Sequence, residues 1–231
     1  MIQDMLRRKF GIRCKAGTLR RALKKIIRFS YRKPRPVPYN AATPEEQERF
    51  KNDVNHLVNE AAREGFTVLS CEQMHARLRP DAGYGWRATN GHDTIKIGYS
   101  RQSGSIVSVL DSDSLHIRTV DACNSKIFKG FLRGMLRIYH KILLILDNAS
   151  YHYKSATVTN FVGDNKGRLR LVFLPAHTPQ LNPIEQQWNV LKRLLAGRYF
   201  ASVGDLRAAI AAIARRRMRP VKMMNYLTVA Q

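Results

Sequence analysis

An apolar run of five residues, Ile142–Leu146, is followed directly by the acidic residue Asp147, and this pairing limits the possible folds more than any other feature. From Asp121 onward, helix-like and strand-like segments alternate. In order they are a helix-like stretch to about Tyr139, the run Ile142–Leu146, a second helix-like stretch, a strand over Leu169–Leu174 and a helix after Pro183. This alternation predicts an α/β fold with parallel strands joined by crossover helices. Asp147 should then lie at the carboxyl edge of the sheet, where ligands usually bind.

The preceding segment favours antiparallel pairing. Three strand-like stretches, at Phe66–Cys71, Thr94–Tyr99 and Ser105–Leu110, follow one another with glycine and serine between them, which predicts a meander. A helix should begin at Thr43, because Thr43-Pro44-Glu45-Glu46 combines a capping hydroxyl, a proline at the first helical position and a capping-box glutamate; it should run to about Arg63. A further amphipathic helix is expected over Ser202–Arg216. The fold class is therefore α/β, with a mixed sheet flanked by helices.

The N-terminal residues are strongly basic. Residues 1–27 are typical of two short helices broken near Gly11, a pattern that suits a helix-turn-helix. Residues 28–42 are rich in proline and cations, which is typical of a linker lying along a DNA backbone. A solvated basic face is the alternative. The candidate DNA-binding residues are Lys15, Arg20, Arg21, Lys24, Arg32, Lys33 and Arg35.

Charge and cysteine content narrow the function classes. Forty lysines and arginines against seventeen acidic residues give a formal net charge of +23, which indicates a polyanionic partner, nucleic acid first, with a ribosomal protein or an acidic-lipid-binding surface as alternatives. The three cysteines have neither zinc-site nor disulfide spacing. No signal peptide or membrane span is expected, which favours a cytoplasmic, nucleoid-associated protein.

Two acidic residues are candidates for metal-dependent chemistry. Asp147 precedes a polar cluster that includes Asn148 and His152, and Glu185 falls in the first turn of a helix whose apolar face begins at Ile184 and Trp188. Each acid alone has a simpler explanation, because Asp is a preferred helix cap and Glu stabilises a helix N-terminus. Together, two carboxylates from neighbouring elements suit Mg²⁺, which prefers oxygen ligands.

The segments Ile145-Leu146-Asp147-Asn148-Ala149-Ser150-Tyr151-His152 and Leu174-Pro175-Ala176-His177-Thr178-Pro179-Gln180-Leu181-Asn182-Pro183-Ile184-Glu185-Gln186-Gln187-Trp188 resemble the second and third catalytic motifs of mariner-like bacterial insertion-sequence transposases of the DDE superfamily. The resemblance implies a ribonuclease-H-like fold, two Mg²⁺ ions that Mn²⁺ can replace, cleavage and strand transfer at element ends, and a homodimer on double-stranded DNA. It makes Asp147 and Glu185 metal ligands, and places Asn148, His152, His177 and Asn182 around them.

The first catalytic motif departs from the family pattern. The family's first Asp is commonly followed by Glu, and the matching dipeptide here is Cys71-Glu72, so Cys71 is expected at the Asp position. A thiol is a poor ligand for Mg²⁺. Glu72 should point to the opposite face of the strand unless a bulge or the strand's end turns it. The sequence therefore predicts a transposase with weakened catalysis, and two alternatives stay open: a DNA-bound remnant that acts as a dominant-negative subunit, and an RNA-binding basic protein.

The expected organisation has four parts. These are a truncated helix-turn-helix-like segment at 1–27, the linker at 28–42, a catalytic domain at 43–216 and a basic tail at 217–231. Relatives usually carry a longer N-terminal DNA-binding region with two helical subdomains, and the chain is expected to begin within the second.

Overall fold

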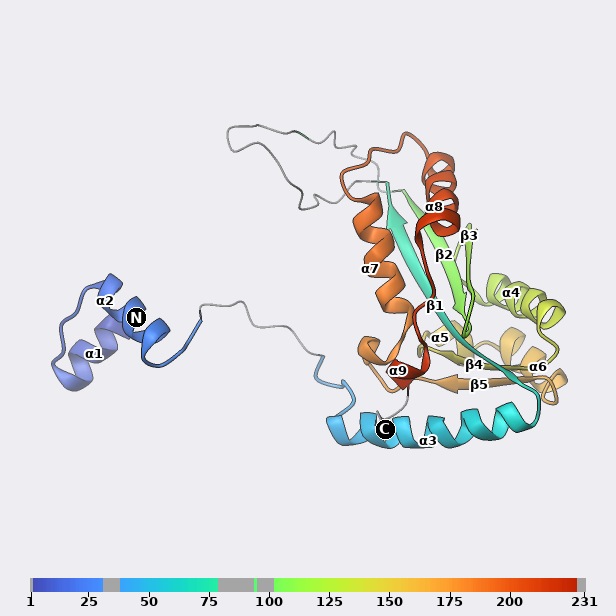
Figure 1. Ribbon diagram of the computed structural model, residues 1–231, viewed down its shortest axis with the longest axis horizontal. Coiled ribbons are helices and arrows are strands. Elements are labelled where there is room, and N and C mark those ends of the chain that lie inside the picture. The colour runs from blue at the N-terminus through green and yellow to red at the C-terminus, as the bar shows by residue number, and fades with distance from the viewer. Residues whose placement is uncertain (1, 31–37, 79–93, 95–101, 228–231) are drawn as a thin grey trace. The chain divides into compact units, whose positions relative to one another are not determined.

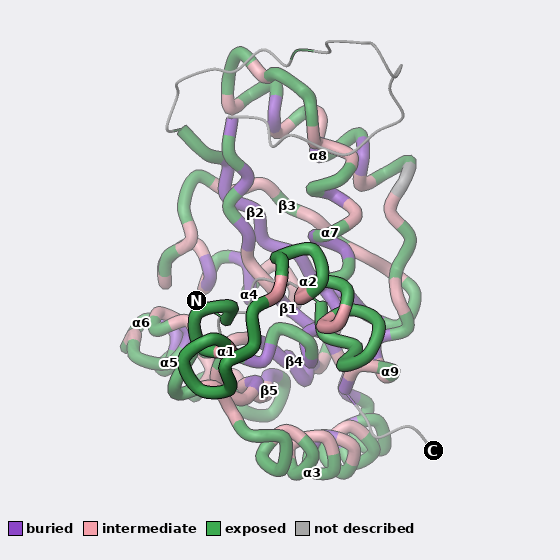
Figure 2. The backbone as a smooth tube through the Cα atoms, turned by 90° about the vertical axis from the view of Figure 1, so that its left-hand side faces the viewer, coloured by how far each residue is buried: buried purple, intermediate pink, exposed green. Residues whose placement is uncertain are grey.

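The computed structural model describes residues 2–30, 38–78, 94 and 102–227, in two compact units, Met1–Pro38 and Tyr39–Gln231. In the first unit, helices α1 (Ile2–Phe10) and α2 (Ala16–Lys25) are the two helices predicted, with Gly11 between them at φ +67°. Neither helix has a buried residue, and both are drawn largely as exposed in Figure 2. Among the candidate DNA-binding residues, Lys15, Arg20, Arg21 and Lys24 are all exposed.

Two parts of the predictions lie outside the described residues. They are Arg32, Lys33 and Arg35 of the basic linker, and most of the strand expected at Thr94–Tyr99.

The second unit is built on a five-stranded mixed sheet with the order β3-β2-β1-β4-β5 (Figure 1). Strands β1, β2 and β3 pair antiparallel, whereas β1, β4 and β5 run parallel to one another, which confirms the predicted mixed sheet. The strands are β1 (Thr67–Arg77), β2 (Ser103–Leu110), β3 (Leu115–Val120), β4 (Ile142–Leu146) and β5 (Leu169–Phe173).

Two strands differ from the expectation. β1 continues for six residues beyond Cys71, because β2 pairs with it without interruption from Ser70 opposite Leu110 to Arg77 opposite Ser103. The third strand of the meander is β3, at the edge of the sheet, which the sequence pattern did not single out.

Helices cover both faces of the sheet, as Figure 1 shows for α7 and α8 on one side and α4 on the other. One apolar cluster joins α4 and α6 to one face through Phe128, Leu132 and Val158, and a second joins α3, α7, α8 and α9 to the other through residues such as Trp188 and Leu206. All five residues of β4 are buried, as expected for a strand covered on both faces. The helices are α3 (Pro44–Arg63), α4 (Ser125–Ile138), α5 (Ser150–Tyr153), α6 (Ala156–Asp164), α7 (Ile184–Leu195), α8 (Val203–Arg217) and α9 (Met224–Leu227), with a 3₁₀ turn at Pro179–Leu181.

The start of the second unit agrees with the sequence prediction, whereas its C-terminal end differs from it. Helix α3 begins at the predicted capping box, since the Thr43 side chain accepts from the Glu46 N–H and the Glu46 carboxylate accepts from the Thr43 N–H. The segment after α8 is not a free basic tail, because Met223 and Leu227 are buried in the core. In the part of the chain that the structure describes, no helix is long and apolar enough to cross a membrane.

Candidate active site

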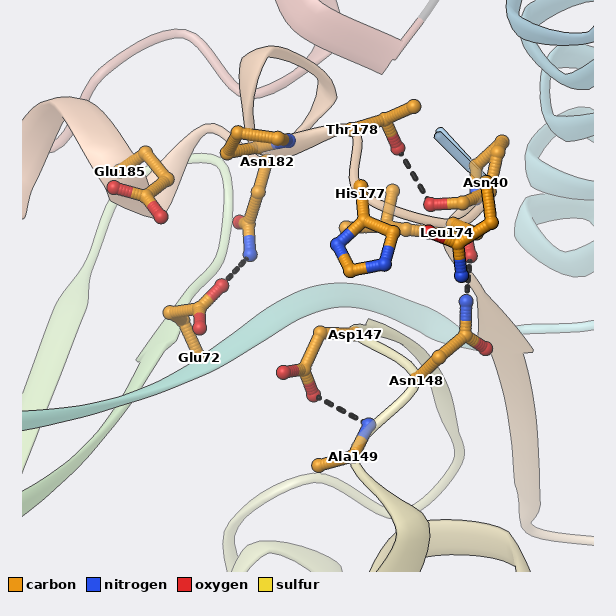
Figure 3. A pocket seen from close by; sticks show the side chains of 13 residues that line it. Asn40, Glu72, Asp147, Asn148, Ala149, Leu174, His177, Thr178, Asn182 and Glu185 are labelled. Atoms are coloured by element: carbon orange, nitrogen blue, oxygen red, sulfur yellow. Dashed lines mark hydrogen bonds between the residues drawn. The ribbon is translucent and has the colours of Figure 1, made fainter. Parts of the chain in front are cut away.

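Three acidic side chains from separate segments line one cavity of about 560 Å³ at the carboxyl end of β4. Asp147 follows β4 directly, Glu185 lies in the first turn of α7, and Glu72 lies in the middle of β1. In the parallel pair, Ser70 is opposite Ile145, so continuing the register by two residues brings Glu72 beside Asp147. Figure 3 shows the three carboxylates around one opening, with the Asn182 side chain pointing at Glu72.

Cys71, which was expected at the family's first Asp position, does not reach this cavity, whereas its neighbour Glu72 lines it. Its side chain is 1% exposed and packs with Leu69, Phe128 and Leu132 on the other face of the sheet. Neighbouring residues of a strand point to opposite faces, and the pairing of β1 with β2 shows no bulge at this point. Glu72 therefore faces the cavity through ordinary alternation, in the straight part of the strand.

The environment of Glu72 disfavours its charged form. Burial first, and then the charges of Asp147 and Glu185, together raise the pKa of this carboxyl from the ordinary value of 4.5 to about 8. The Asn182 amide donates to Glu72, which acts in the opposite direction. Asn182 is itself buried, accepts from the Ser70 hydroxyl at 3.1 Å and from the Ile184 N–H at 3.2 Å, and so joins β1 to the start of α7.

A chain of hydrogen bonds leads from Asp147 away from the cavity. His152, 2% exposed, places its Nδ1 3.1 Å from an Asp147 carboxylate oxygen and 3.2 Å from the Asp147 carbonyl oxygen. Its Nε2 lies 3.3 Å from the Gln73 amide nitrogen, and the Tyr151 hydroxyl donates to the Gln73 amide oxygen. Because the Gln73 amide can only donate to Nε2, the imidazole proton is placed on Nδ1, where it donates to Asp147.

Gln73 and Tyr151 were missed by sequence reasoning. Neither residue stands out alone in the sequence. Tyr151 precedes His152 in the second motif, and alternation places Gln73 on the same face of β1 as Cys71, so only the two facts together could have indicated a contact.

The loop between β5 and α7 forms another wall of the cavity. Asn148 donates to the Leu174 carbonyl oxygen, which joins the ends of β4 and β5, and Thr178 donates to the Pro175 carbonyl oxygen at 2.7 Å. His177 is exposed and lines the cavity with φ +53°, a left-handed conformation that is uncommon outside glycine. Such residues are concentrated at functional sites. The four residues expected around the metal ligands, Asn148, His152, His177 and Asn182, thus all lie within or directly behind the cavity wall.

The carboxylates fit a hard divalent cation by chemistry. All three donor groups are oxygens, the kind that Mg²⁺ prefers, and a cation between them would relieve the mutual repulsion that, after burial, raises the pKa of the Glu72 carboxyl. Among the described residues, no three acidic, histidine or cysteine side chains are close enough to form a ready ligand set.

The mixed sheet in this strand order, with an acidic cavity where β1 and β4 meet α7, defines a ribonuclease-H-like fold. A family comparison matches residues 67–207 to the DDE superfamily endonucleases, and the chain belongs to this family. Residues 1–54 match the winged helix-turn-helix family, a match that extends past α2 into α3. A comparison with curated protein sequences finds no match.

Solved structures of a mariner transposase share the fold. A Mos1 transposase paired-end complex with the left transposon end has a TM-score of 0.65 at 13% identity, covering 98% of this chain and 69% of that one. A pre-cleavage Mos1 transpososome gives 0.66 at 14% identity with the same coverage. A Mos1 paired-end complex with Mn gives 0.65 at 15% identity, covering 97% and 69%. The ribonuclease-H-like fold that the motifs implied is thereby confirmed.

Proposed function

We propose that this chain is an insertion-sequence transposase that cuts DNA at the ends of its element and joins them to a target, with Glu72, Asp147 and Glu185 as the metal ligands. The observation that carries the proposal is the meeting of these three carboxylates in one cavity. Membership of an endonuclease family and a strongly basic chain support it. The Mos1 complexes, which contain transposon ends and in two cases Mn or Mg, support DNA and a divalent cation as partners.

When bound, Mg²⁺ ions at such a site activate a water or a 3′-hydroxyl and stabilise the leaving oxygen of a phosphodiester. The chain's own residues prepare the site. Glu72, Asp147 and Glu185 would hold the cation; Asn182 orients the Glu72 carboxyl, and the His152 imidazole holds the Asp147 carboxylate in place. Gln73 and Tyr151 act as positioning residues, because they fix the tautomer of His152. His177, on the exposed wall, is placed to contact the DNA backbone.

DNA would be held mainly by the basic N-terminal unit. The exposed cations Lys15, Arg20, Arg21 and Lys24 on and beside α2 suit contacts to phosphates and base edges, and the linker cations Arg32, Lys33 and Arg35 suit phosphate contacts. Assembly as a homodimer on paired element ends is part of the proposal.

The test is nicking of a plasmid that carries the genomic segment around the coding sequence, in Mg²⁺, in Mn²⁺ and in EDTA. Cutting should require the cation, and Glu72→Gln, Asp147→Asn and Glu185→Gln should each lower the rate by more than about 100-fold, beyond the loss typical of groups that only support a metal ligand. Cys71→Ser is the matched control and should keep the activity. Cutting that survives all three carboxylate substitutions would refute the proposal.

A DNA-bound remnant without nuclease activity is the second candidate. It is favoured by the absence, among the residues described, of three ligands already close enough to hold a metal, and by the high pKa of Glu72. A remnant would bind element ends in EDTA and in Mg²⁺ alike and would cut in neither. Metal-dependent nicking by the wild-type chain would eliminate it.

A further inference from the structure

Helix α4 carries four cations and no acidic residue. Lys126, Arg133 and Arg137 are exposed, and their spacing of seven and four residues places them along one side of the helix. Lys129 is half-buried beside them. None of the four forms an ion pair with a described acidic residue. We call Lys126, Lys129, Arg133 and Arg137 the α4 basic stripe.

The middle of the stripe is supported from below by an aromatic ring. The Lys129 ammonium and the Arg133 guanidinium each lie 5.9 Å from the centre of the Phe161 ring on α6. Side chains held against a ring have less freedom to lose when they bind a partner. From Lys126 to Arg137 the stripe spans about 16 Å at the helical rise, the length of about five base pairs of duplex DNA.

Two glycines lie among these cations. Glycine inside a helix costs roughly 1 kcal/mol relative to alanine, so a packing or functional reason is expected for each. A Cβ added at Gly130 or Gly134 would meet nothing within 4 Å, which means that no described part of this chain requires a glycine there. Because glycine has no Cβ, the helix surface at these positions lies close to its backbone, and the backbone of another molecule can approach it closely.

We infer that the α4 basic stripe is a docking surface for the sugar–phosphate backbone of duplex DNA. Between Lys126 and Arg137 only Gly130 and the cation Arg133 are exposed, and Gly134 is half-buried, whereas the centre of a protein interface would need exposed apolar or aromatic side chains. Helix α4 packs on the face of the sheet opposite to α7, which carries Glu185, so this contact lies apart from the reacting phosphodiester and is independent of sequence. The choice of DNA as the polyanion rests on the proposed function.

The experiment measures the salt dependence of DNA binding by the full chain. Fluorescence anisotropy with a labelled duplex of arbitrary sequence is recorded in EDTA for the wild type and for a triple variant, Lys126→Gln, Arg133→Gln and Arg137→Gln. The matched control, Arg63→Gln, Lys192→Gln and Lys222→Gln, removes the same charge from exposed positions on and beside the elements of the other face. A third variant, Lys126→Arg, Arg133→Lys and Arg137→Lys, keeps every cation, and thermal unfolding checks that all variants fold.

Loss of three phosphate contacts should lower the slope of log K against log salt by about 2.7, so that the Kd ratio between about 200 and 50 mM salt falls about 40-fold. The control should change the slope by less than about 1, and the charge-keeping variant should match the wild type. An unchanged slope in the stripe variant, equal losses in stripe and control variants, or a change in oligomeric state without a change in slope would each overturn the inference. Asp147→Asn with Glu185→Gln should keep the slope while abolishing cutting, which separates this inference from the proposed function.

Discussion

Replacing Cys71 by aspartate would install the residue that the family pattern has at this point, yet the structure predicts that the substitution destabilises the protein. Cys71 is 1% exposed among the apolar side chains of the α4 face. Burial, followed by the charges of Glu72 and Asp147, raises the pKa of its thiol well above the ordinary value. The same causes would act on an aspartate at this position and keep it neutral.

The cost can be worked from the proton that the folded variant must bind. Keeping a carboxyl of ordinary pKa near 3.9 protonated costs about 1.4 kcal/mol per pH unit, or about 5 kcal/mol at about pH 7.5 and about 1.5 kcal/mol at about pH 5. An unpaired buried hydroxyl adds about 1–3 kcal/mol at either pH. Because a folded-state pKa above the unfolded value favours the folded state only at low pH, the variant loses stability as pH rises. The total at the higher pH is comparable to the whole stability of an ordinary domain, about 5–15 kcal/mol.

Urea unfolding in EDTA at the two pH values measures this difference, with Cys71→Ala as the control that removes the thiol without adding a charge. Cys71→Ala should lose about the same stability at both pH values, and less than Cys71→Asp loses near neutral pH. If Cys71→Asp were as stable as Cys71→Ala near neutral pH and cut DNA faster than the wild type, Cys71 would face the cavity and the assignment of Glu72 would be refuted.

Three further predictions concern the cavity and the hydrogen bonds behind it. Because burial and two neighbouring carboxylates raise the Glu72 pKa from 4.5 to about 8, the metal-free protein should lose roughly 3–5 kcal/mol of stability as pH rises through that interval. Urea unfolding in EDTA should show a flatter profile for Glu72→Gln, and parallel profiles would contradict the assignment. Gln73→Leu should lower the cutting rate 10- to 100-fold and move the ¹⁵N signal of His152 Nε2, while an unchanged tautomer with full activity would show that the hydrogen-bond chain is incidental. His177→Gly should raise thermal stability, by about 1 kcal/mol at most, because φ +53° suits glycine, and should weaken DNA binding; loss of stability would show that the ring holds the loop.

The sequence predicted the parallel half of the sheet well because short, unbroken stretches of the chain mark its strands and helix starts. The run Ile142–Leu146 is apolar at every position, and Pro183 and Glu185 mark the start of α7, so both segments lie on the elements that the sequence predicted for them. Strand β3 was missed although Leu115–Val120 alternates apolar residues with His116 and Arg118, a pattern that fits a half-exposed edge strand. Helix α9 has only four residues, too few for a periodic pattern.

The sequence could not predict which residue of the Cys71-Glu72 dipeptide faces the cavity, because the face of a strand is a tertiary property. Alternation states that Cys71 and Glu72 point in opposite directions, but it does not state which direction leads to Asp147. That choice depends on the register of β1 against β4, where Ser70 lies opposite Ile145, and on the packing of α4 against Cys71. Neither is encoded in the dipeptide itself.

The central claim is that Glu72 is the third carboxylate of a metal site with Asp147 and Glu185. Equilibrium titration of the metal-free protein with Mn²⁺, followed by electron paramagnetic resonance of the free ion, tests this without relying on cutting. Wild type and Cys71→Ser should bind Mn²⁺ equally, and Glu72→Gln should weaken binding as severely as Asp147→Asn or Glu185→Gln. Wild-type affinity in Glu72→Gln, together with loss of binding in Cys71→Ser, would contradict the account.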